Sequence, residues 1–162
     1  MKAGARRSAP IITISEFSRQ EIELRLGPQC PVLITSSQPA GIEPVSASEL
    51  RENEPLFLMV GALRGYKGAG TVIEALGKAG PDVKVACVGV AESEDGVTGK
   101  IRSDIDRAGV GDRFEMLGWV EETELKALYR KAAGSINPSE YEGYGLTVTE
   151  SLAAGLPTLA SD

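Results

Sequence analysis

Short apolar runs alternate with amphipathic stretches from Leu56 to the end of the chain. Five apolar runs have the length of β-strands and occupy residues 56–61, 83–90, 114–120, 134–139 and 156–161. The stretches between them place apolar residues three or four positions apart, which is helical spacing, at residues 70–80, 97–110, 122–134 and 146–155. Most of these stretches close on glycine, as helix C-caps do. The pattern therefore predicts successive βαβ units.

The predicted strand "VKVACVGV" at residues 83–90 is almost continuously apolar. Such runs are typical of a parallel sheet whose two faces are both covered by helices. We therefore expect an α/β fold, a Rossmann-like doubly wound parallel sheet. Ligands of such sheets bind beyond the carboxyl ends of the strands, so the loops after Val60, Val90, Val120 and Ser139 are where a site is expected.

The residues before Leu56 have a different organisation. Residues 1–36 contain one strand-helix-strand pattern, and residues 37–54 are rich in Pro, Ser and Glu and read as a linker to a domain at 55–162. A unit of about 36 residues cannot bury a core of its own. We expect it to dock on the larger domain or on something outside the chain, or to form a homodimer through an exposed apolar edge near residues 11–36.

Composition and charge narrow the class of protein. Hydrophobic residues make up 42% and charged residues 25% of the chain, as in a soluble globular protein. The net charge of −6 without a basic patch argues against nucleic acid as a partner. The basic first residues lead into the short apolar segment "IITI", which is too short for a signal peptide or a membrane span, so a cytoplasmic location is the expectation.

Two residue types bear on metal binding and nucleophilic catalysis. The chain has no histidine and only two cysteines, Cys30 and Cys87, which are far apart in the sequence. A zinc site, a Cys-His pair or a Ser-His-Asp triad cannot be formed from these residues. We expect both cysteines to be buried and reduced.

Lys67 lies in a glycine-rich turn between a predicted strand and a helix that begins near Ala69. Such a turn aims backbone N–H groups and the positive end of a helix dipole at one point, which suits a phosphate within reach of a lysine. The segment "VGALRGYKGAG" matches neither the Walker nor the Gly-x-Gly-x-x-Gly pattern. An ordinary turn with a solvated lysine is the alternative.

A second anion site is predicted where the segment "YEGYGLTVTES" enters a helix near Gly145 or Leu146. Four backbone amides lie at or just before its first turn, those of Gly143, Tyr144, Gly145 and Leu146. Glu150, one turn further on, can accept hydrogen bonds from a vicinal diol such as a ribose, while Glu142 lies in the turn itself. The alternative is that both are exposed acids favoured by the helix N-terminus.

The segment "PSEYEGYGLTVTESLAAGLPTLASD" resembles the donor-site signature of retaining GT-B glycosyltransferases of the group-1 type, the family often numbered four. The family's two glutamates, separated by seven residues, correspond to Glu142 and Glu150. "VGALRGYKG" is similar to the family's Gly-Arg-Leu-x-x-x-Lys-Gly segment, and "MLGWVEETELKALYRKA" to its Gly-x-Val followed by an acidic, Leu-rich helix. The resemblance runs from about Ile11 to Asp162.

The resemblance implies roles for individual residues. Lys67 would hold the diphosphate of a nucleotide-sugar, Glu150 the ribose hydroxyls, and Glu142, as the catalytic residue, the transferred sugar. The amides of Gly143 to Leu146 would hold the distal phosphate or sugar hydroxyls. Trp119 would border the nucleobase or, equally, belong to the core. The reaction would need no metal ion and no cofactor beyond the donor itself.

The chain departs from the family pattern at one binding position. The family's arginine falls at Ala62, and Arg64 lies two residues later as a candidate substitute. Diphosphate binding is expected to be weakened if Arg64 does not point the same way.

The resemblance covers the end of an acceptor domain and most of a donor domain. We therefore expect a fragment, or one half of a split enzyme, that is inactive without an acceptor domain supplied in cis or in trans. Contact with a membrane would come only through parts outside the chain. The expected function is donor binding in a hexosyltransferase that moves sugar from a UDP- or GDP-sugar to a saccharide or lipid-linked acceptor. A catalytically inert binding module and a nucleotide-sugar epimerase are the alternatives.

Overall fold

The computed structural model describes residues 10–27, 30–35, 44, 46, 55–89 and 96–161. The chain divides into two compact units. The smaller consists of residues 1–39 with 142–146, and the larger of residues 40–141 with 147–162. The loop expected after Val90 and nearly all of the expected linker at 37–54 lie outside the described residues.

The larger unit contains one five-stranded sheet. Its strands are β3 (Leu56–Val60), β4 (Lys84–Val88), β5 (Phe114–Gly118), β6 (Gly134–Asn137) and β7 (Thr158–Ala160). All neighbouring pairs are parallel, and the spatial order is β5-β4-β3-β6-β7. The chain moves outward from β3 to β5 and then returns to the other side of β3. The order therefore reverses between β3 and β6, which is where such sheets bind ligands.

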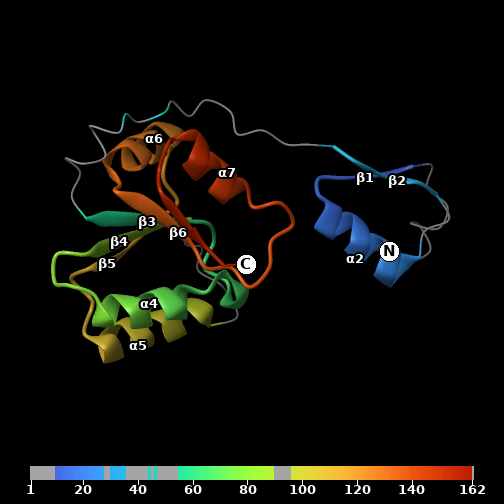
Figure 1. Cartoon of the computed structure of the whole chain (residues 1–162). Helices are drawn as coiled ribbons and strands as arrows, with labels where there is room; N and C mark the ends of the chain where they lie inside the picture. Colours follow the sequence, from blue (N-terminus) through green and yellow to red (C-terminus); the bar gives the residue numbers. More distant parts are fainter. Residues whose placement is uncertain are drawn as a thin grey trace. The chain divides into compact units, whose positions relative to one another are not determined.

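Helices cover both faces of this sheet. They are α4 (Ala69–Lys78), α5 (Val97–Ala108), α6 (Glu122–Lys131) and α7 (Leu146–Ala153), and a short 3-10 turn, η1 (Gly65–Lys67), precedes α4. Figure 1 shows α4 and α5 on one face, and α6 and α7 on the opposite face. Each face has its own apolar core, one around Ile73 and Ile105 and the other around Leu58 and Leu156. The predicted doubly wound α/β fold is confirmed.

The buried strand β4 shows why the sequence predicts this fold. Val85, Ala86, Cys87 and Val88 are all buried, because alternate side chains point into the two opposite cores. Burial raises the pKa of the Cys87 thiol to about 12, so this thiol stays protonated. The other cysteine, Cys30, is only half-buried, so the expectation that both are buried is wrong for Cys30.

Helix ends differ from the expectation in two of the four helices. α5 ends at Gly109 in the left-handed conformation (φ 65°), as the sequence pattern predicts. α4 and α6 instead end at Ala79 and Ala132, each in an extended conformation. In both, the cap N–H still bonds a carbonyl of the last turn, so a glycine is not required.

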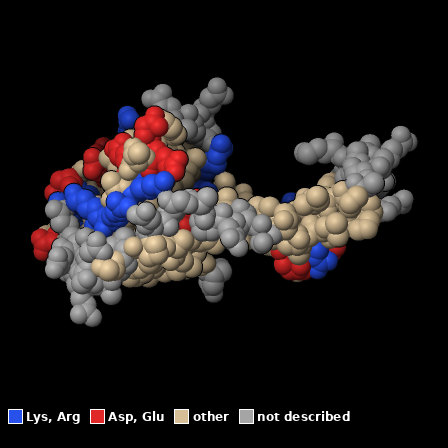
Figure 2. Space-filling model, turned by 90° about the horizontal axis from the view of Figure 1, so that it is seen from above, with Lys and Arg blue, Asp and Glu red and all other residues tan. Residues whose placement is uncertain are grey.

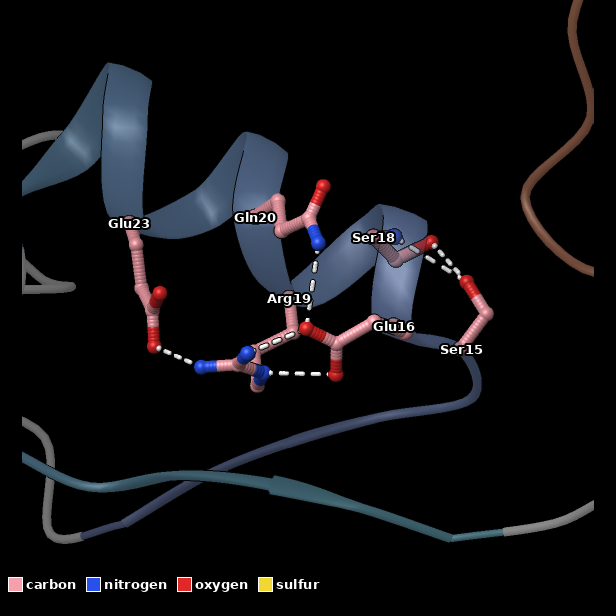
Figure 3. Close-up of polar contacts among 6 residues, drawn as sticks. All are labelled: Ser15, Glu16, Ser18, Arg19, Gln20 and Glu23. Atoms are coloured by element: carbon pink, nitrogen blue, oxygen red, sulfur yellow. Dashed lines mark hydrogen bonds and ion pairs between the residues drawn. The ribbon is translucent and has the colours of Figure 1, made fainter.

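The smaller unit contains β1 (Ile11–Thr13), α2 (Glu16–Leu26) and β2 (Val32–Ile34), with the two strands parallel. Figure 3 shows the start of α2, where the Ser15 side chain accepts a hydrogen bond of 3.0 Å from the Ser18 N–H. Arg19 bonds Glu16 on one side and Glu23, at 2.8 Å, on the other. These contacts join residues three or four positions apart within α2. They are of the kind that stabilises isolated helices.

α2 has no buried residue. Large apolar side chains of the smaller unit are exposed, among them Ile12 (67%), Leu24 (80%) and Leu33 (50%). Among the described residues, this unit therefore gains little from apolar burial, as expected for its size.

Charged side chains of both signs lie next to one another on the face of the larger unit seen in Figure 2. On α6, for example, Lys126 pairs with Glu122 at 2.7 Å. No helix within the described residues is long and apolar enough to cross a membrane.

Candidate functional site

The turn after β3 brings Lys67 back over the end of that strand. Gly61 follows β3 with a φ of 131°, a conformation open to glycine. A Cβ at Gly61 would lie 3.9 Å from the Lys67 Nζ, so the lysine side chain passes over this glycine. The ammonium group is thereby held at the carboxyl end of β3, the edge at which the fold predicts a ligand.

Gly68 joins the turn to α4 and is in contact with the loop after β6. Its φ is 71°, and a Cβ at this position would lie 2.2 Å from the carbonyl oxygen of Pro138. No residue with a side chain fits there without a backbone shift. Gly68 is also the N-cap of α4 and has no side chain that could cap the helix. The first N–H groups of α4 therefore have no side-chain cap from this position.

The loops after β3 and β6 are held together by further contacts. The Glu140 N–H donates a 2.8 Å hydrogen bond to the Tyr66 carbonyl oxygen. The rings of Tyr66 and Tyr141 stack with centroids 4.5 Å apart, and the Lys67 Nζ lies 5.4 Å from the Tyr66 ring centroid, within the range of a cation–π interaction. These contacts restrict where the lysine can move.

The carboxyl ends of the neighbouring strands are joined by backbone hydrogen bonds. The Gly61 N–H donates to the Val88 carbonyl oxygen at 2.8 Å, and the Gly89 N–H donates to the Gly118 carbonyl oxygen at 2.6 Å. Trp119 follows Gly118 directly and is 75% exposed. The alternative that Trp119 belongs to the core is therefore wrong, and its indole ring stands in solvent at the edge where β5 ends.

Side chains at the end of β6 fix the first turn of α7. The Asn137 Nδ2 donates a 3.0 Å hydrogen bond to the Thr147 Oγ1, and the Ser139 hydroxyl donates a 2.7 Å bond to the Asn137 Oδ1. The Ser139 carbonyl oxygen in turn accepts a bond from the Ser161 hydroxyl. The Ser151 hydroxyl donates to the Thr147 carbonyl oxygen at 2.8 Å. α7 thus has a defined position relative to the end of β6.

Glu150 lies in the second turn of α7 and is half-buried. Its Oε2 accepts a 3.3 Å hydrogen bond from the hydroxyl of Tyr129 on α6. Tyr129 is 1% exposed. Burial, together with the nearby Glu150 charge, raises the pKa of Tyr129 well above its usual value, so the hydroxyl keeps its proton and remains a donor.

The other residues that the sequence predicts for the site lie in the turn after β3 and in the loop before α7. Arg64 is exposed and is the N-cap residue of η1, and Ala62, at the position of the family's arginine, is half-buried. Residues 142–146 group with the smaller unit. Within this loop, Gly145 is buried with a φ of 81°, Glu142 is half-buried, and Leu146 is 43% exposed where α7 begins.

The structure therefore places Lys67, Arg64, Trp119 and Glu150 in the larger unit and the Gly143–Leu146 amides in the smaller one. In the part of the chain that the structure describes, no group of three or more Cys, Asp and Glu side chains is arranged to hold a metal ion.

Comparisons with known proteins agree with this architecture. The described fold is similar to the sucrose-phosphate synthase of Thermosynechococcus elongatus, with a TM-score of 0.80 and 24% identity over 98% of this chain and 42% of that chain. It is also similar to HepE of Anabaena, solved in complex with UDP and glucose, with a TM-score of 0.76 and 21% identity over 97% of this chain and 45% of that chain. The likeness to these structures confirms the Rossmann-like α/β fold.

The protein family of the chain is shown by sequence comparison. The family model "Glycosyl transferases group 1" matches residues 43–162, and the chain belongs to this family. A relative is the glycogen synthase of Mycobacterium tuberculosis (strain H37Rv), which is 30% identical across 97% of this chain. The chain spans 38% of the length of that relative. The recognition of a group-1 GT-B glycosyltransferase domain from the sequence is confirmed.

Sequence reasoning missed Tyr129. Its spacing relative to Leu125 and Leu128 on the apolar face of α6 is that of an ordinary core residue. The available signal was the hydroxyl, since a buried tyrosine usually needs a hydrogen-bond partner. The partner, Glu150, could not be named without the tertiary structure, because 21 residues separate the two.

Proposed function

We propose that the chain provides the donor site of a retaining glycosyltransferase that uses a UDP- or GDP-sugar without a metal ion. The observation that carries the proposal is the position of the Lys67 ammonium group over Gly61, at the carboxyl end of β3 and directly before the N-terminus of α4. A lysine and a helix N-terminus at one strand end form an anion site suited to a diphosphate.

Glu150 supports the nucleoside part of this proposal. It lies on α7, which follows β6, and β6 is the neighbour of β3 at the point where the strand order reverses. A carboxylate accepts hydrogen bonds from both hydroxyls of a ribose, as acidic residues do in other Rossmann-like folds. The exposed indole of Trp119, after β5, would border the nucleobase.

The chemistry of donor cleavage explains these residue types. Breaking the bond between the anomeric carbon and the diphosphate leaves positive charge on the sugar and negative charge on the leaving group. A preorganised lysine and N–H groups stabilise the diphosphate as its charge develops, which replaces a metal ion in that role. By family resemblance, Glu142 contacts the transferred sugar, and the Gly143–Leu146 amides hold the distal phosphate or sugar hydroxyls.

The acceptor side is proposed from resemblance alone. A hexose would be transferred to a saccharide or a lipid-linked saccharide, with an acceptor-binding domain supplied in cis or in trans. HepE, one of the similar structures, is in complex with UDP and glucose, which favours UDP as the first nucleotide to test here.

The test is calorimetric titration of the 162-residue chain with UDP, GDP and ADP in EDTA. Selective binding of one diphosphate is the expected result. Binding that requires added Mg²⁺ would overturn the metal-independent part of the proposal, and binding to none of the three would reject the donor site.

A catalytically inert module is the second candidate, because Ala62 stands where the family has an arginine. Lys67→Ala tests whether a diphosphate site is present despite this substitution. Loss of a charged hydrogen bond should weaken UDP binding by about 1.5–3 kcal/mol, roughly tenfold or more, and leave uridine binding unchanged. Lys78→Ala, which removes a lysine from the other end of α4, is the matched control and should change neither. Equal effects of Lys67→Ala on UDP and uridine would reject the phosphate role.

A further inference from the structure

We infer that Tyr129 is a positioning residue of the donor site, which orients the Glu150 carboxylate and thereby selects a ribonucleotide over a deoxyribonucleotide. The inference rests on the proposed function, because it takes Glu150 as the group that binds the ribose. What it adds is a second residue, on a different helix, and a defined chemical selectivity.

Tyr129 lies in an apolar core. Its ring is packed in the core that includes Leu58, Val88 and Leu156, beneath α6, and it is 1% exposed. A ring so enclosed has one orientation, since interiors are packed to nearly the density of crystals. The hydroxyl at its tip is consequently a fixed point, in contrast to the end of a flexible surface side chain.

The Tyr129 hydroxyl donates its hydrogen bond to one carboxylate oxygen of Glu150, Oε2, at 3.3 Å. A glutamate on a helix surface otherwise has several rotamers open to it. Because the Tyr129 hydroxyl on α6 occupies Oε2, the second carboxylate oxygen can accept a hydrogen bond from a ligand.

The helix that carries Glu150 is also fixed in position. α7 is itself anchored by the Asn137 amide on Thr147, three residues before Glu150, at 3.0 Å. The backbone of Glu150 is thus fixed from β6, and its side-chain tip is fixed from α6. A glutamate fixed at its backbone and at its tip loses little conformational freedom on binding a diol, which favours affinity. Because the carboxylate cannot move far, affinity depends on where each ligand hydroxyl lies.

The protonation state agrees with this geometry. Burial and the adjacent carboxylate both raise the pKa of Tyr129, so the phenol remains a donor to Glu150 at neutral and mildly alkaline pH. A phenolate at this position would repel the carboxylate that it is meant to hold.

The experiment compares UDP with 2′-deoxy-UDP, each titrated calorimetrically into the intact chain and into Tyr129→Phe. The substitution removes one oxygen and keeps the ring. We expect UDP to bind about threefold to tenfold more weakly to Tyr129→Phe, the range for one lost hydrogen bond. Binding of 2′-deoxy-UDP should change less, so that the ratio of the two dissociation constants moves toward one. A purely structural role would weaken both ligands equally.

Ser103→Ala is the control, because it removes a hydroxyl from an exposed position on α5 and should leave the UDP to 2′-deoxy-UDP ratio unchanged. Glu150→Gln separates the inference from the proposed function. If Glu150→Gln leaves the ratio unchanged, the ribose assignment fails and the proposed function loses its nucleoside contact. If Glu150→Gln lowers the ratio and Tyr129→Phe does not, only the role of Tyr129 is overturned.

Should Tyr129→Phe fail to fold, as judged by far-UV circular dichroism without ligand, the intact chain supplies the readout instead. NMR of the chain labelled at the tyrosine ring carbons should show the Tyr129 signals shift on adding UDP and shift less on adding 2′-deoxy-UDP. Identical shifts with both ligands, or none with UDP when UDP binds, would overturn the inference.

Discussion

At the scale of single residues, Gly68 decides whether the two loops that form the candidate site can meet. Its positive φ and the nearby Pro138 carbonyl oxygen both exclude a side chain. Gly61 has a similar backbone requirement, but the nearest atoms there belong to the flexible Lys67 side chain, which could move aside. Gly68 is thus the less tolerant of the two glycines.

Gly68→Ala should lower the free energy of unfolding by roughly 2 kcal/mol or more, because strained backbone and a steric conflict combine at one position. Gly80→Ala is the matched control, since a Cβ at Gly80 meets nothing within 4 Å and the backbone there is not left-handed. We expect the control to stay within about 0.5 kcal/mol of the original chain in urea unfolding. Equal values for the two variants would contradict the account of this loop contact.

Which residues the sequence could identify depends on how local their signal is. Lys67 and Glu150 each follow a predicted strand within one turn-and-helix segment, and their positions at strand ends follow from the alternation of elements. The contact of Gly68 with Pro138 joins positions 70 residues apart, and only the parallel pairing of β3 with β6 brings them together. Close contacts of this kind depend on tertiary packing and leave no local pattern in the sequence.

At the scale of elements, α5 is stabilised by a charged group at its buried side. Asp104 is 6% exposed and pairs with Lys100 at 2.8 Å and with Arg107 at 2.5 Å, both on the same helix. The hydrogen bond from Lys100, followed by the charges of Lys100 and Arg107, holds the pKa of Asp104 below its usual range. A depressed carboxylate pKa contributes stability above the unfolded-state pKa, near 3.9 for Asp.

We therefore expect this contribution to be present at neutral pH and to disappear as the pH falls below about 4 through the folded-state pKa. Asp104→Asn should lower the urea midpoint at pH 7 and have a smaller effect at pH 3. Asp106→Asn, an exposed position on the same helix, should change neither midpoint appreciably. An effect of Asp104→Asn that is the same at both pH values would show that packing, and not charge, is what the substitution disturbs.

The elements were largely predictable, and their ends less so. All five strands of the larger unit appear within the apolar runs that predict them. The signal is clearest for β4, where four successive residues are buried and apolar. The glycines at 80 and 134 predict the ends of α4 and α6 beyond their actual caps, Ala79 and Ala132. The actual ends are set by where the chain must turn back toward β4 and β6.

At the scale of the whole molecule, the two units differ in how much apolar surface they bury. The larger unit has two cores, whereas α2 in the smaller unit has no buried residue. Local stability follows buried contacts, so we expect amides of α2 to exchange hydrogen much faster than those of β3 and β4 in the intact chain. Hydrogen exchange followed by mass spectrometry measures this directly. Equal protection of α2 and β4 would mean that the apolar side chains of α2 are covered in solution.

The most direct test of the account is where a nucleoside diphosphate binds on the chain. In NMR titrations of the ¹⁵N-labelled chain with UDP in EDTA, the account predicts the largest shifts at Gly61, Gly68 and Gly70, between the end of β3 and the first turn of α4, and at Glu150 on α7. Amides at Gly80 and Gly109, at the other ends of the helices, should not move. Shifts confined to the α4–α5 surface around Lys100 and Arg107, with none near Lys67, would contradict it.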